Sequence, residues 1–370
     1  MKTFHCSHCQ NLIYFENTRC LECDYTLAYL PDRQTMSALQ PGTDGTWSPA
    51  ETSPETSAQQ SSYRLCANYT EQNVCNWAAL ASEPDALCLS CRLTRVIPNL
   101  GEAGNHEAWC RLETAKRRML YSLLHLNLPL RSKAEDATAG LAFEFLNDAD
   151  QPNGDRSRVL TGHDNGLITV NVAEADDVYR ERQRQQQHEP YRTLLGHFRH
   201  EIGHYYWDRL IQGDARLEQF RRLFGDERDD YQQSLDRHYR DGPPADWGRR
   251  FISAYASMHA WEDWAETWAH FLHMSDALQT ARAVGISVNP RKPGEPSLKG
   301  EADLSRAVTG RFDAMLTAWW PLTYALNNLT RGLGLADGYP FVLSPPVIEK
   351  LRFVHDVIAD HGGLTQAVAA

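Results

Sequence analysis

The chain has two parts that differ in the spacing of their apolar and polar positions. From about residue 105 the apolar side chains recur at helical spacing, and the first such stretch, residues 106–127, forms one stripe from Leu112, Met119, Leu120, Leu123 and Leu124. Residues 141–146 and 167–172 alternate as strands do. Helical patterns follow over residues 190–212, 214–224, 227–239, 245–283, 302–330 and 346–360. The pattern predicts an α+β domain over residues 105–370, mostly helical with a small sheet near its start.

The first hundred residues carry no comparable helical pattern. Eight of the nine cysteines lie between Cys6 and Cys91, which predicts a small cysteine-rich module over residues 1–97. Residues 33–62 are rich in Ser, Thr, Pro, Gly and Gln and poor in large apolar side chains. Such a segment buries too little surface to offset its ordering entropy. We therefore expect a long flexible loop at about residues 33–63.

The first four cysteines form two CxxC pairs ten residues apart, Cys6/Cys9 and Cys20/Cys23. Each CxxC turn places two thiolates on one side of a metal, and two turns complete a tetrahedron for Zn²⁺. The spacing therefore predicts a structural zinc site. A closed set of four thiolates leaves no position for water or substrate, which argues against catalysis there.

The second group has looser spacing, with one CxxC pair and two single cysteines: Cys66, Cys75, Cys88 and Cys91. It favours a second structural Zn²⁺, and the alternative is a small core of unliganded thiols. One or two structural zinc ions are therefore expected in the module. They would supply folding energy to a region that is too polar to rest on its core alone.

Charge and hydropathy limit the partners of the chain. The net charge is −11, and neither part has the basic footprint that phosphate binding requires, so a nucleic-acid partner is disfavoured. No stretch is long and apolar enough to predict a membrane span. The N-terminus, MKTFHCSHCQ, has no apolar run of a signal peptide. These features predict a cytoplasmic protein. Because the cytosol keeps thiols reduced, the nine cysteines are then expected as metal thiolates rather than disulfides.

The strongest candidate for chemistry is the HExxH segment His200-Glu201-Ile202-Gly203-His204 within a predicted helix. Residues four apart share a helix face, so His200 and His204 can present imidazoles to one metal ion. Glu201 would then reach a water on that metal and act as general base. The motif is short, and a third ligand is needed to complete a catalytic site.

A later helical segment, residues 261–270, offers that ligand. Glu262 and Glu266 lie one turn apart among tryptophans, which is unusual for a solvated face. One carboxylate can bind Zn²⁺ while the other forms a hydrogen bond to a metal-binding residue and holds it in position. The spacing by itself does not decide which glutamate has which role.

The combination resembles the gluzincin metallopeptidases, which carry HExxH on one helix and a Glu-xxx-(Asp/Glu) pair on a later one. The resemblance implies that Glu262 is the third ligand of a catalytic zinc and that Glu266 orients a histidine. Tyr255, seven residues before Glu262, matches the tyrosine that stabilises the oxyanion in lethal-factor-type gluzincins. Because residues 245–283 are expected to form one helix, Tyr255 would lie two turns away on the face of Glu262. Packing in the core is the alternative role for this tyrosine.

A closer resemblance covers nearly the whole chain. It is similar to the bacterial family described as a putative zinc-binding metallopeptidase with an N-terminal zinc ribbon. The matching stretches are residues 88–98, 161–166, the His200 helix, 224–227, 253–270 and 339–343. The resemblance implies a zincin-like domain after a zinc-ribbon module.

These residues predict a zinc-dependent hydrolase, most simply a peptidase acting on a peptide or protein. Two alternatives stay open: a non-catalytic zincin scaffold whose zinc ribbon binds a protein partner, and a zinc amidase acting on a small molecule. Of the remaining histidines, His163 is interpreted as a turn residue rather than part of the cleft. His270 and His273 are expected behind the metal ligands or at the surface.

Overall fold

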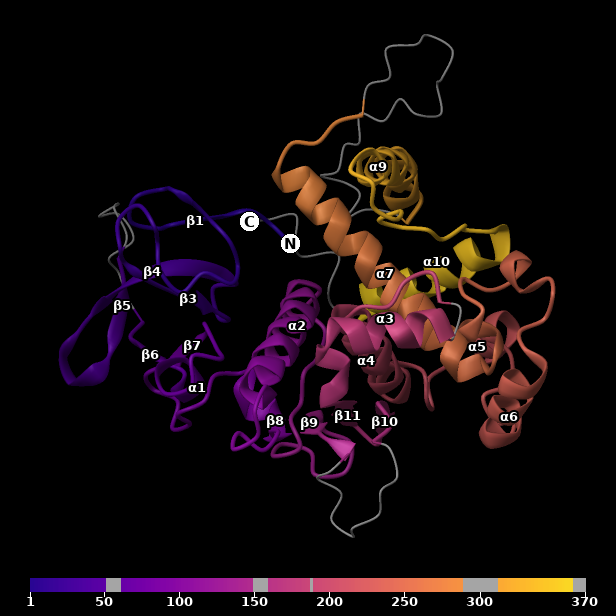
Figure 1. Ribbon diagram of the computed structural model, residues 1–370, viewed down its shortest axis with the longest axis horizontal. Helices are drawn as coiled ribbons and strands as arrows, with labels where there is room; N and C mark the ends of the chain where they lie inside the picture. Colours follow the sequence, from indigo (N-terminus) through magenta and orange to yellow (C-terminus); the bar gives the residue numbers. More distant parts are fainter. Residues whose placement is uncertain (51–60, 149–158, 187–188, 289–311, 362–370) are drawn as a thin grey trace.

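Figure 1 shows the computed structural model, which describes residues 1–50, 61–148, 159–186, 189–288 and 312–361. The helices are α1 (Ala67–Thr70), α2 (Asn105–His125), α3 (Asp177–Gln186), α4 (Leu194–Leu210), α5 (Leu217–Phe224), α6 (Tyr231–Asp241), α7 (Ala260–Ala283), α9 (Phe312–Gly332) and α10 (Pro345–Asp360). The strands are β1 (Phe4–His5), β2 (Leu12–Ile13), β3 (Thr26–Leu30), β4 (Thr35–Pro41), β5 (Trp47–Pro49), β6 (Tyr63–Leu65), β7 (Ala78–Leu80), β8 (Thr94–Val96), β9 (Ala142–Leu146), β10 (Gly162–Asp164) and β11 (Leu167–Asn171).

The cysteine-rich part is a β structure. Strands β1 and β2 pair with each other, and β3 to β7 form an antiparallel sheet in sequence order. This corrects the expectation of a flexible loop at residues 33–63, because β4 and β5 lie inside it. The apolar residues of β4 are few, but Met36 and Ala38 enter the main core while Leu39 enters a second small core. Residues 51–60 lie outside the described part.

The second sheet has the order β10-β11-β9-β8 and supports the larger domain. Strands β9 and β11 occupy the two segments that alternation predicts, and they pair in parallel. Strand β10 pairs antiparallel with β11. Strand β8 follows the second cysteine group directly and adds to the same sheet beside β9, so the two parts of the chain are joined through this sheet.

The helical half agrees with the predicted pattern except before α7. The segment 245–283 is not one helix: α7 begins at Ala260, after two 3-10 turns, η6 (Trp247–Arg249) and η7 (Tyr255–Ser257). His259 interrupts it with an extended backbone (φ −153°, ψ 153°), and its side chain accepts the hydrogen bond of the Trp261 amide as a cap. In the predicted helix 302–330, residues 302–311 lie outside the described part, and the remainder belongs to α9.

Helices α4 and α7 pack against each other at the centre of the larger domain (Figure 1). Gly203 makes this approach possible, because a Cβ at that position would lie 3.1 Å from Ala265 Cα and 3.2 Å from Trp268 Cβ. The Trp264 indole N–H donates a 2.8 Å hydrogen bond to the carbonyl of Gly203. No helix in the described ranges is long and apolar enough to cross a membrane.

Candidate metal centre

Helices α4 and α7 bring together three side chains with metal-binding atoms. His200 and His204 stand one turn apart on α4, and Glu262 faces them from the first turn of α7. The Nε2 atoms of the two histidines are 3.2 Å apart. Glu262 Oε2 lies 2.9 Å from His200 Nε2, and Glu262 Oε1 lies 3.5 Å from His204 Nε2. The three donors therefore converge on one point, as the sequence predicts.

The chemistry of this trio fits a zinc ion better than a network of hydrogen bonds. Glu262 Oε2 is buried and forms no hydrogen bond despite its short distance to His200. Burial would raise the pKa of Glu262, but the imidazoles of His204 and His200 hold it well below its usual range. Two imidazoles and one carboxylate form a common ligand set for catalytic zinc, which leaves a further position open.

Glu266 lies behind His200 rather than beside the other two donors. Its Oε1 is 2.7 Å from His200 Nδ1, and its Oε2 accepts a 2.6 Å hydrogen bond from Ser253. Burial would raise the pKa of Glu266, but His200 and Ser253 lower it to about 2. The geometry thus separates the two glutamates: Glu262 joins the histidine Nε2 atoms, and Glu266 holds the opposite side of one ring.

Tyr231 is a member of the site that the sequence did not indicate. Its hydroxyl donates a 2.9 Å hydrogen bond to Glu262 Oε1 from helix α6, 31 residues away in sequence. Burial raises the pKa of Tyr231, and the carboxylates of Glu262 and Glu201 raise it further. The segment around Tyr231 gave only a helical pattern, and no spacing rule connects it to α7.

Tyr255 reaches the site by a different route from the one expected. It lies on η7, outside α7. The expectation that Tyr255 and Glu262 share one continuous helix, two turns apart, is therefore wrong. Its ring nevertheless lies 6.0 Å from the ring of His200, and it interacts with Tyr231. Burial and the nearby Glu262 raise the pKa of Tyr255 well above its usual value, so the phenol keeps its proton.

The other histidines take distinct places. His163 lies on β10, with its ring 6.2 Å from that of His204, and its Nε2 accepts a 2.8 Å hydrogen bond from the Gly166 amide. His163 therefore lies on a strand beside the metal centre, rather than in the turn where the sequence places it. His270 is buried behind the site, with Nδ1 2.9 Å from the Tyr339 hydroxyl. His273 contacts Arg199.

Both predicted groups of four cysteines are assembled as clusters. In each cluster the sulfur atoms lie within 4.8 Å of one another, and all eight thiols are free of disulfides. Sγ–Sγ distances such as the 3.6 Å between Cys6 and Cys23 are close to the roughly 3.8 Å expected for thiolates bound to a tetrahedral zinc. Helix α2 supplies Arg117 beside the second cluster, where the Cys75 thiolate and Glu113 raise its pKa against the effect of burial.

Comparison with known sequences agrees with this arrangement. Residues 105–357 match the family described as "Putative zinc-binding metallo-peptidase", and residues 3–102 match a zinc-ribbon domain. The chain belongs to this metallopeptidase family. The α+β fold and the resemblance on which the sequence prediction relied are therefore confirmed. The match covers both helices of the metal centre, α4 and α7.

Curated relatives occur in mycobacteria. Proteins of Mycobacterium bovis and of two strains of Mycobacterium tuberculosis are each 41% identical over 359 residues, which is 97% of this chain and 95% of the relative. Each is named only as an uncharacterized protein. No solved structure gives a significant match.

Proposed function

We propose that the protein is a zinc-dependent hydrolase that cleaves peptide bonds in a peptide or protein substrate. The observation that carries this proposal is the convergence of His200, His204 and Glu262, with Glu201 next to His200 on α4. The site would hold one catalytic zinc, and the two cysteine clusters would hold two structural zinc ions. When bound, the catalytic ion activates water and polarises a carbonyl group.

The residues of the chain have separate tasks in this proposal. Glu201 would accept the proton of the attacking water and pass it to the leaving amine. Tyr255 would donate a hydrogen bond to the oxygen that gains negative charge, since its phenol stays protonated. Glu266 would hold His200 through its Nδ1 atom and leave Nε2 for the metal.

A peptide substrate is favoured over a small amide by the position of β10. This strand stands at the end of the sheet order and lies against α4. An extended peptide can add to such an edge by backbone hydrogen bonds, a mode in which affinity comes from the main chain. The cysteine-rich module is proposed to contribute a surface for a protein partner, and reduced thiolates suit action in the cytoplasm.

The test is a comparison of the zinc-loaded wild type with Glu201→Gln on a peptide library read by mass spectrometry. We expect the variant to keep its zinc and to lose cleavage by roughly 100-fold or more, in line with loss of general base catalysis. Glu218→Gln is the control, because Glu218 is an exposed glutamate of α5. Full activity in Glu201→Gln would reject the mechanism. Hydrolysis of small amides without any peptide cleavage would reject the substrate class.

A further inference from the structure

A cavity of about 630 Å³ lies between the N-terminal strands and the helices of the larger domain. One wall comes from residues 1–4 and 12–16, and the opposite wall comes from α4, α7, α9 and residues 338–341. His200, His204 and Glu262 do not line it. The cavity is therefore separate from the metal centre, although α4 and α7 contribute to both.

The body of the cavity is apolar. Aromatic rings line it from both parts of the chain: Phe4, Phe15, Tyr191, Trp319, Tyr339 and Phe341. Its volume falls within the range of roughly 300–1,000 Å³ that is typical of sites for small molecules, which combine an apolar lining with a few polar groups. A site of this kind selects a ligand with an apolar body and a defined polar end.

Arg199 lines the cavity and supplies its polar end. Its guanidinium contacts His273 and pairs with Asp276, both on α7. The side chain is only 4% exposed, yet its Nε–H has no hydrogen-bond partner in the described structure. Leaving a buried N–H donor without a partner costs free energy. A ligand that offers a hydrogen-bond acceptor to this N–H would therefore bind more tightly.

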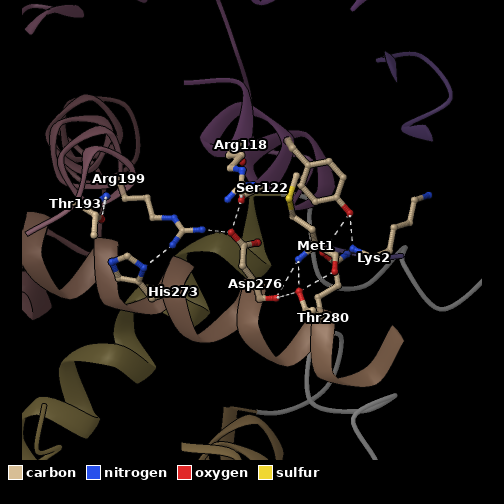
Figure 2. A network of polar contacts seen from close by, with 12 residues as sticks. Met1, Lys2, Arg118, Ser122, Thr193, Arg199, His273, Asp276 and Thr280 are labelled. Carbon is tan, nitrogen blue, oxygen red and sulfur yellow. Dashed lines mark hydrogen bonds and ion pairs between the residues drawn. The ribbon is translucent and has the colours of Figure 1, made fainter. Parts of the chain in front are cut away.

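Asp276 already has hydrogen-bond and ion-pair partners, so its negative charge repels an anionic ligand only weakly. Besides Arg199, its carboxylate accepts a 2.6 Å hydrogen bond from Ser122, and its carbonyl accepts one of 3.0 Å from the amino group of Met1 (Figure 2). The charged side chains that line the cavity are three cations, Lys2, Arg118 and Arg199, and two anions, Glu16 and Asp276. The cavity thus has a positive surplus in a chain whose net charge is −11.

We propose that this cavity binds a small apolar carboxylate, of the type of a medium-chain fatty acid, with its alkyl chain among the aromatic rings and its anionic group at Arg199. A peptide fits the lining less well. It would bring an amide and a carbonyl group with every residue, and an apolar wall leaves such groups without partners. An alkyl chain brings none. This site does not depend on hydrolysis at the metal centre.

The first experiment measures whether the cavity is a binding site. The full-length, zinc-loaded protein is titrated with decanoate below its micellar concentration, with displacement of the fluorescent apolar anion anilinonaphthalene sulfonate as the readout. Ala277 lines the cavity, so Ala277→Phe fills it and is expected to raise the Kd for decanoate at least tenfold. Ala283→Phe adds the same ring at an exposed position of α7 outside the lining and should leave binding unchanged. Equal binding by the two variants, or no saturable binding to wild type, would overturn the proposal.

The second experiment tests the charge of the ligand. Decanoate should bind at least tenfold more tightly than decanol or decylammonium, and Arg199→Gln should remove that preference. Arg282→Gln, at an exposed position near the end of α7, should retain it. Zinc content and thermal unfolding establish that each variant is folded. If Arg199→Gln does not fold, the ligand series on wild type still decides the matter. Decylammonium binding as tightly as decanoate would refute an anion site.

Discussion

His200 Nδ1 lies 2.7 Å from Glu266 Oε1, and this contact determines that Nδ1 is protonated. Because Glu266, with a pKa of about 2, is ionised at neutral pH, its oxygen can only accept. The Nδ1 atom of His200 must therefore carry a proton, so Nε2 is the atom that would supply a lone pair to a metal ion.

Replacing Glu266 by Gln is expected to weaken zinc binding at the metal centre. The amide is neutral and holds the His200 ring less firmly, and loss of such partners typically costs 10–100-fold in metal affinity. Competition with a chromogenic chelator measures this. Glu218→Gln serves as the control and should titrate like wild type. An unchanged affinity in Glu266→Gln would show that the contact does not support the ligand.

The two tyrosines are expected to differ in their effects. Tyr255→Phe removes the proposed donor to the oxyanion and should lower kcat by about 100-fold with little change in KM. Tyr231→Phe removes a hydrogen bond to Glu262 and should lower zinc affinity as well. Tyr239, an exposed tyrosine of α6, supplies the control Tyr239→Phe. A Tyr255→Phe variant with the kinetics of Tyr239→Phe would leave Tyr255 a packing residue.

Gly203 is expected to be indispensable for the approach of α4 to α7. Alanine is the better helix former by about 1 kcal/mol, but its Cβ would meet Ala265 and Trp268 at 3.1–3.2 Å. Overpacking of this kind typically costs about 1–3 kcal/mol, and any separation of the helices moves Glu262 away from the histidines. Urea unfolding of Gly203→Ala should therefore show lower stability. Gly248→Ala, with no atom near its Cβ, is the control, and equal stability of the two variants would contradict this account.

Burial of His270 predicts a stability that falls in acid. Burial lowers its pKa from 6.5 to about 4, so the folded state keeps the ring neutral while the unfolded state takes up a proton. Its contribution is complete above pH 6.5 and is lost as the pH falls towards 4, by roughly 1.4 kcal/mol per pH unit. Between pH 7 and 5, wild type should lose about 2 kcal/mol more than His270→Gln in urea unfolding. Parallel losses would show that His270 titrates normally.

The sequence predicts the parts of this protein that rest on regular spacing. The HExxH segment of α4, the pair Glu262 and Glu266, and the CxxC turns are all local patterns, and the structure assembles each of them. The strands β9 and β11 follow from simple alternation. A period of two or 3.6 residues needs no knowledge of distant contacts.

The remainder depends on contacts between distant segments. Strand β4 looked like a polar linker because its few apolar residues are divided between two cores. The break before α7 comes from one capping side chain, His259, which resembles an ordinary helical residue in the sequence. Tyr231 reaches Glu262 across 31 residues of sequence, through a hydrogen bond between α6 and the first turn of α7. The cavity at Arg199 exists only where the N-terminal strands meet the helices.

Zinc content is the most direct test of the central claim, that His200, His204 and Glu262 hold a metal ion apart from the two cysteine clusters. The measurement is the number of zinc ions per chain in purified wild type and in His200→Ala, by inductively coupled plasma mass spectrometry. The account predicts three zinc ions in wild type and two in the variant. Equal zinc content in the two proteins would contradict it.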